Sequence, residues 1–113
     1  MKIEAENYWI EYNPATATAS FAGTLRLNGM VGYGPIVRLL NDIIDQTPPQ
    51  VTLDIQNLQF LNSSGINVLS KFVIQARQKQ LSLLVKGSQS ISWQKKLLKN
   101  LQRLMPALQV EFT

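Results

Sequence analysis

The sequence predicts an α/β protein in which a mixed β-sheet is covered by about three helices. Three observations lead to this fold class: two period-two segments near the N-terminus, three later segments of helical period, and short β-branched segments between the helices. Strands that alternate with helices form crossover units on one sheet. The expected order is therefore β-β-α-β-α-β-α-β. Since 113 residues suffice for one core, we expect a single domain over residues 1–113.

The first two expected strands form a hairpin. Tyr8–Tyr12 is aromatic and β-branched, and it ends at the turn signal Asn13-Pro14. Thr16–Leu27 alternates apolar and hydroxyl side chains, which is typical of a strand with one buried face. Gly23 interrupts this alternation and indicates a bulge.

Three amphipathic helices are expected after the hairpin. In Pro35–Gln46 apolar residues recur at spacings of three and four, and proline is tolerated in a first helical turn. A second helical pattern begins near Ile66, and a third carries the leucines of Leu97–Met105 and ends at Pro106. The connecting strands are expected at Val51–Ile55, Leu81–Lys86 and Leu108–Phe112.

The composition excludes most catalytic chemistry. The chain has no Cys and no His, which excludes thiolate nucleophiles, disulfides, ordinary zinc sites and triads that need an imidazole base. Asp42 and Asp45 lie on one face of an expected helix, where we expect them to be solvated and not to form a catalytic pair. Asp54 suits Mg²⁺ binding or general-base chemistry by type, but local capping or pairing is the commoner role of such a residue. We expect no enzyme, no cofactor and no metal.

Charge is divided unequally along the chain. Residues 1–54 carry a net charge of −3, whereas residues 55–113 hold eight basic groups and a single acid. The basic groups are spread over two expected helices without a nucleic-acid-binding motif, so we expect solvated helix faces and no specific nucleic acid partner. No apolar run approaches the roughly 18 residues of a membrane span, and no secretory signal opens the chain. A cytoplasmic protein is expected.

The segment in which a strand passes into a helix is the best candidate for a site. Asn62-Ser63-Ser64-Gly65 follows a buried strand and opens the second helix, whose first amide groups have no partner in the helix. Asn62 or Ser63 can cap those amides. The same amides also favour a phosphate group. A serine at this position can therefore be both a structural cap and a phosphate acceptor.

These residues also carry a resemblance to a known family. The stretch from Leu53 to Ile66 resembles the signature of the STAS domain, the family of bacterial anti-sigma-factor antagonists. In that family a strand precedes Asp-Ser-Ser/Thr-Gly-Leu/Ile at the start of a helix. The similarity extends over the order of expected elements along the whole chain. The sequence also resembles a cyanobacterial branch of small STAS-like regulators.

The resemblance implies a partner-switching role in bacterial signal transduction and transcription regulation. By correspondence Ser63 is the phosphorylated residue, Ser64 is the second choice, and Asn62, Ser63, Ser64 and Gly65 form the partner-binding site. The implied partners are a serine-kinase anti-sigma factor, which binds the unphosphorylated form, and a cognate phosphatase. Asn62 stands where the family has an aspartate, and an amide keeps the capping role without the charge.

Three alternatives stay open at this level. The chain can be a STAS-type module that binds a protein without being phosphorylated, or one that binds a small ligand or lipid. The basic third helix can lie on an anionic membrane, although its leucine stripe favours a core position. The first strand is rich in aromatic residues: Tyr8, Trp9 and Tyr12. Their rings can pack across the hairpin or form an interface, and the sequence leaves undecided whether the chain forms a homodimer through this strand.

Overall fold

The computed structural model describes all 113 residues and contains one six-stranded sheet and three helices. The elements, in chain order, are β1 (Lys2–Glu4), β2 (Tyr8–Asn13), β3 (Thr18–Leu25), α1 (Gly29–Asp45), β4 (Gln50–Leu61), α2 (Ser63–Gln78), β5 (Ser82–Gly87), α3 (Ser92–Leu104) and β6 (Gln109–Phe112).

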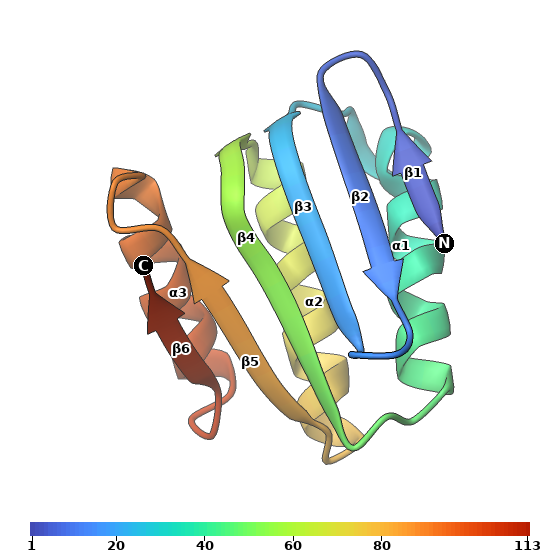
Figure 1. Cartoon of the computed structure of the whole chain (residues 1–113), viewed down its shortest axis with the longest axis vertical. Coiled ribbons are helices and arrows are strands. Elements are labelled where there is room, and N and C mark those ends of the chain that lie inside the picture. The colour runs from blue at the N-terminus through green and yellow to red at the C-terminus, as the bar shows by residue number, and fades with distance from the viewer.

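The six strands lie in the sheet in the same order as in the sequence. β1, β2 and β3 are antiparallel neighbours, and β3 to β6 are parallel. Each parallel pair is joined by one helix, and because successive crossovers of one hand step in the same direction, all three helices lie on one face of the sheet (Figure 1). All three helices therefore begin at the same edge, where the parallel strands end.

The core lies between the sheet and the helical layer. Alternate residues of β4 are buried at Val51, Leu53 and Ile55, and they belong to a cluster of 28 buried apolar residues to which all three helices contribute. The opposite face of the sheet carries polar side chains in the same alternation, such as Ser20 and Asp54. The mixed α/β class expected from the sequence is confirmed.

Two elements differ from the prediction at the N-terminal side. β1 was not expected, because three residues are too few to show a period of two; the strand forms by pairing with β2, with Ile3 opposite Ile10. α1 begins at Gly29 instead of Pro35, so the proline lies inside the helix. Gly34 makes this possible, since the clash that proline imposes on the preceding residue involves a Cβ that glycine lacks.

β4 is one long strand, where the sequence predicted a short strand at Val51–Ile55 followed by a separate apolar segment. The register against β3 shifts twice, between Ser20 and Ala22 and between Gly23 and Thr24, and each time β4 contains the extra residue. The irregularity expected at Gly23 is therefore present, but the inserted residues lie opposite it. Gly23 itself has φ +90, and a Cβ there would lie 2.9 Å from Tyr8 Cα.

The hairpin aromatics divide between the core and the surface. Tyr12 is buried beneath the helices, whereas Trp9, on the other face of β2, remains 36% exposed. Core packing thus accounts for Tyr12 and leaves the Trp9 ring on the open face of the sheet.

Gln94 is the one buried polar side chain of the core, and it holds the irregular part of β4 in place. Its Nε2 donates to the carbonyl oxygens of Ile55 (2.7 Å) and Leu58 (3.0 Å), and its Oε1 accepts from the amide of Ser88 (2.8 Å). The pairing of β4 with β5 ends at Asp54, and beyond that point the side chain of Gln94, from α3, donates to the β4 carbonyls.

We therefore expect Gln94→Leu to lower the free energy of unfolding by about 3 kcal/mol, since two buried carbonyls and an amide lose their partner. Chemical denaturation measures the change. Gln78→Leu, at an exposed position of α2, is the matched control. Equal stability of the Gln94 and Gln78 variants would show that Gln94 does not hold β4.

Candidate functional site

The junction between β4 and α2 is built around the side chain of Asn62. Asn62 is the N-cap of α2, and its Oδ1 accepts a hydrogen bond from the amide of Gly65 (3.0 Å). The same oxygen accepts from Tyr33 Oη (2.6 Å), and Nδ2 donates to the carbonyl oxygen of Leu27 (2.8 Å). One side chain thus joins the start of α2 to α1 and to the loop before α1.

These contacts give a physical reason for an amide at this position. The Leu27 carbonyl accepts a hydrogen bond from Nδ2, and an ionised aspartate has no hydrogen to donate there. Tyr33 completes the arrangement, because its ring is buried and its hydroxyl donates to Oδ1; burial also raises the pKa of that hydroxyl. The departure from the Asp-Ser-Ser-Gly pattern is thus built into the packing of α1 against α2.

Gly65 is required by the same cluster. The residue is buried, and a Cβ at this position would lie 2.6 Å from Tyr33 Oη and in contact with the side chain of Leu61. The space beside Gly65 is thus filled by the Leu61 side chain and by the hydroxyl that also binds Asn62.

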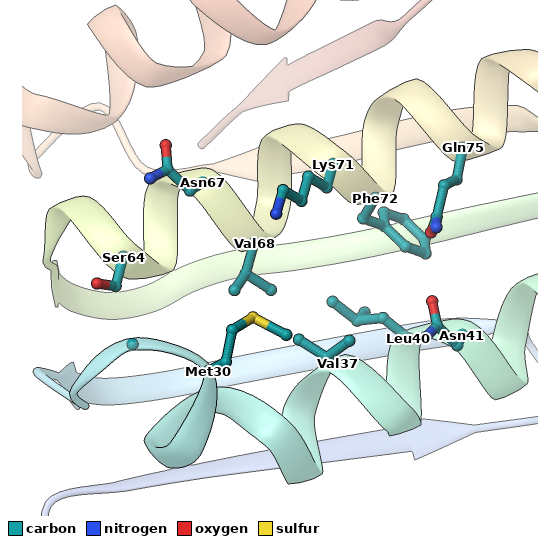
Figure 2. A pocket seen from close by; sticks show the side chains of 11 residues that line it. Met30, Val37, Leu40, Asn41, Ser64, Asn67, Val68, Lys71, Phe72 and Gln75 are labelled. Carbon is teal, nitrogen blue, oxygen red and sulfur yellow. The ribbon is translucent and has the colours of Figure 1, made fainter.

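The two serines occupy different environments. Ser63 is the first residue of α2 and is exposed, while Ser64 is half-buried at the end of a pocket between α1 and α2 (Figure 2). Since Asn62 provides the cap, neither hydroxyl is needed for that purpose. Of the two roles that the sequence left open for Ser63, the cap belongs to Asn62, and the Ser63 side chain is free at the surface.

Exposed apolar residues surround this junction. Met30 and Val31, in the first turn of α1, are 64% and 95% exposed, and Phe60 and Ile66 are exposed on either side of the two serines in the sequence. The guanidinium of Arg26 lies 4.6 Å from the centre of the Phe60 ring. We call the set Met30, Val31, Phe60, Ser63 and Ile66 the junction surface. Its composition suits contact with another protein.

The pocket between α1 and α2 has a volume of about 240 Å³. Figure 2 shows Met30 and Val37 of α1 pointing toward Val68 of α2. Ser64 and Lys71 contribute polar atoms to its lining, so that it combines an apolar floor with hydroxyl and ammonium groups. The pocket was not predicted, because it depends on how closely two helices pack and not on a pattern within either one.

The acidic residues do not gather into a site. No group of three or more Asp and Glu side chains is placed to hold a metal ion. Asp54 Oδ1 accepts from the amide of Gln56 (3.1 Å), which is the local pairing expected for it. None of the helices has the length and apolar character needed to cross a bilayer, and the α3 leucines at 97, 98 and 101 are buried in the core, as their spacing indicated.

An open mixed sheet with all its helices on one face defines a two-layer α/β domain. Within that class the STAS domain matches residues 33–103, and the chain therefore belongs to the STAS domain family. The resemblance drawn from the junction sequence is thus confirmed. No curated protein matches the sequence.

Solved structures of similar fold include regulators of two kinds. A chain in the crystal structure of the diguanylate cyclase SiaD in complex with its activator SiaC, from Pseudomonas aeruginosa, matches with a TM-score of 0.77 at 13% identity, over 100% of this chain and 99% of that one. The structure of apo-SiaC from the same organism matches with a TM-score of 0.76 at 13% identity, over 100% of this chain and 97% of the SiaC chain. An anti-sigma factor antagonist from Mycobacterium paratuberculosis matches with a TM-score of 0.60 at 18% identity, over 90% and 83%. At these identities the likeness concerns the fold.

The Asn62 contacts predict that Asn62→Asp is destabilising even though it restores the family's residue. The lost hydrogen bond to Leu27 should lower the free energy of unfolding by about 1–2 kcal/mol at neutral pH, only partly offset by the favourable charge at the helix start. Thermal and chemical denaturation measure the change. Asn67→Asp, at an exposed position of α2, serves as control. An Asn62→Asp protein at least as stable as the wild type would contradict this account of the amide.

A second expectation concerns the space beside Gly65. Gly65→Ala should lower the free energy of unfolding by about 1–3 kcal/mol, because the new methyl group must displace the Leu61 side chain and the Tyr33 hydroxyl that binds Asn62. The variant is compared by denaturation with Tyr33→Phe, which removes the hydroxyl. If the hydroxyl is the obstacle, Gly65→Ala lowers the free energy of unfolding by less in the Tyr33→Phe background than in the wild type. An equal loss of stability in the two backgrounds rules this explanation out.

Proposed function

We propose that this chain is a STAS-type regulatory protein that binds a protein partner through the junction surface and is switched by phosphorylation of Ser63. The observation that carries the proposal is that Ser63 is exposed at the first position of α2 while Asn62 provides the cap. The hydroxyl is thus open to a kinase, and its modification leaves the hydrogen bonds that form the junction intact.

The fold can accept a phosphate at this position. The first amides of α2 have no acceptors within the helix, and the first turn contains no acidic residue. The positive end of the helix dipole favours an anion by about 0.3–1 kcal/mol. Phosphorylation should therefore change the surface of the protein without weakening its fold.

The same modification opposes docking. A phosphate adds about −1.5 to −2 charges at one point, and a partner that covers the exposed apolar residues beside Ser63 would have to desolvate it. A penalty of about 3 kcal/mol weakens binding about a hundredfold. The unphosphorylated form is thus the binding form, and the phosphorylated form releases the partner.

The expected partner is a regulatory protein of the serine-kinase or anti-sigma type, with a phosphatase that reverses the modification. Support comes from the family and from the fold: one structural neighbour is an anti-sigma factor antagonist, and another is described as the activator of a diguanylate cyclase. Both descriptions concern action through another protein. In this proposal the 113 residues act in the cytoplasm as one domain that is not an enzyme and needs no cofactor.

A second candidate function rests on the pocket between α1 and α2. Its apolar floor and polar lining suit a small amphipathic ligand, and Ser64 lies within it. In this case the chain is a ligand- or lipid-binding STAS module, and Ser63 has no regulatory role.

The switch is tested with Ser63→Ala and Ser63→Asp. The protein captured by the wild-type chain from a host lysate is identified by mass spectrometry and purified, and its Kd for each variant is measured. Ser63→Ala should bind as the wild type does, and Ser63→Asp about a hundredfold more weakly, because the added charge opposes docking.

Ser92→Asp is the matched control, since Ser92 is the exposed first residue of the neighbouring helix α3. Intact-mass and peptide analysis of the protein isolated from its host should place phosphate on Ser63, with Ser64 as the second site. If Ser63→Asp binds the partner as tightly as Ser92→Asp and no phosphate is found, the switch is excluded and the ligand-binding alternative gains support.

A further inference from the structure

Two of the three helices carry only positive charge, and the acids of the helical layer, Asp42 and Asp45, lie on α1. Helices α2 and α3 and the residue that follows α2 carry seven cations and no acid: Lys71, Arg77, Lys79, Lys95, Lys96, Lys99 and Arg103. We call these seven residues the cationic face. The open face of the sheet has the opposite balance, with four acids and two lysines at positions 2, 4, 11, 54, 86 and 111.

The acids do not neutralise the cationic face. All seven of its side chains are exposed, and the single ion pair of the chain joins Lys2 to Glu4 (3.0 Å) on β1. On the sheet, the register places Glu11, Ser20, Asp54, Lys86 and Glu111 in one row across neighbouring strands, so these charges lie on the face turned away from the helices. Only Arg77 has a polar partner, the carbonyl oxygen of Leu104 (3.0 Å).

The cationic face adjoins the proposed switch. Ser63, Asn67 and Lys71 follow one another at helical spacing and are all exposed, so Ser63 begins the ridge that carries Lys71 about 12 Å further along α2. α3 starts at the same edge, because Trp93 Nε1 donates to the carbonyl oxygen of Gln59, near the end of β4 (2.8 Å). Lys95 and Lys96 therefore lie in the turns of α3 nearest to the junction.

We infer that the cationic face docks an acidic surface of the partner protein. Opposite charges on two surfaces raise the association rate and fix the orientation of the complex. The inference rests on the proposed function and names the chemistry of its partner. It also gives the switch a second component, since a phosphate on Ser63 has the same sign as the incoming surface.

A protein suits this face better than a membrane or a nucleic acid. Insertion into a bilayer needs exposed apolar anchors among the cations, but the leucines of α3 are buried and Ile74 is the only large apolar residue exposed along the ridge beyond the junction surface. Single-stranded nucleic acid binds by stacking on exposed aromatic rings, and the only aromatic residues of α2 and α3 are Phe72, which is buried, and Trp93, which is half-buried.

The test uses a defined probe, a fluorescent 20-residue helical peptide with glutamate along one face, and a counterpart in which every glutamate is replaced by glutamine. Anisotropy titrations at 50 and 300 mM salt, together with amide chemical shifts, report affinity and location. The glutamate peptide should bind at least about tenfold more tightly than its counterpart at low salt, and the shifts should be confined to α2 and α3.

Matched variants distinguish an effect of the cationic face from an effect of the net charge of the protein. Lys95→Gln/Lys99→Gln should weaken binding about fivefold, whereas Lys2→Gln/Lys86→Gln, with the same change in net charge on the sheet side, should leave it unchanged. Equal effects of the two pairs, or shifts spread over the sheet, overturn the inference. Tighter binding to a 20-base-pair DNA or to vesicles with 30% phosphatidylglycerol also overturns it.

The Ser63→Asp protein distinguishes this inference from the switch. If Ser63→Asp binds both the peptide and the purified partner as the wild type does while Lys95→Gln/Lys99→Gln weakens binding of both, the cationic face is a docking surface and the switch fails. If Ser63→Asp abolishes binding of the purified partner while Lys95→Gln/Lys99→Gln has no effect on the partner or on the peptide, the switch holds and the docking surface is refuted.

Discussion

The hydrogen bonds of one side chain fix the geometry of the junction on which the rest of the site depends. Asn62 bonds to the start of α2, to Tyr33 of α1 and to the backbone before α1, so three segments meet at one amide group. Each bond contributes only about 0.5–1.5 kcal/mol to stability. Their larger effect is on shape, because they hold β4 and two helices in the arrangement that leaves Ser63 outside and Gly65 inside.

The junction also separates two tasks that serine could have combined. In a helix that begins with serine as the cap, phosphorylation would replace the hydroxyl that bonds the first amides by a phosphate, and so would change a structural contact. Here the cap is an amide, and the serine hydroxyl that follows is uncommitted. A change of charge at Ser63 can therefore act on a partner while the fold stays the same. Gln94 supports the other side of the same region, since it holds the irregular end of β4 from α3.

The positive charge of the molecule is concentrated on two of its helices, α2 and α3. The basic half of the sequence forms two of the three helices, α2 and α3, so its cations lie on neighbouring helices on one side of the sheet, while the acids of that side, Asp42 and Asp45, are confined to α1. The first turns of all three helices contain no acid, and all three start at the same edge.

The sequence by itself determined the fold class, most of the elements and the register of the Asn62–Gly65 motif at a helix start. These features follow from periodicity, turn residues and capping, which act within a few residues. The sequence also predicted that the serines lie beside the N-cap of the helix. It did not determine whether the Ser63 hydroxyl caps the helix or is free. That decision required Tyr33 and Leu27, which lie 29 and 35 residues from Asn62 in the chain and reach it only because α1 packs beside α2.

Other features were decided by tertiary structure alone. The extension of α1 back to Gly29, the inserted residues of β4, the buried amide of Gln94 and the pocket beside Ser64 all depend on contacts between segments far apart in the sequence. The spread of lysines and arginines looked like ordinary solvated helix faces until the crossovers placed α2 and α3 on one side of the sheet, where none of these side chains forms an ion pair. A one-dimensional pattern specifies which side of each helix is polar, but only packing specifies which polar sides share a surface.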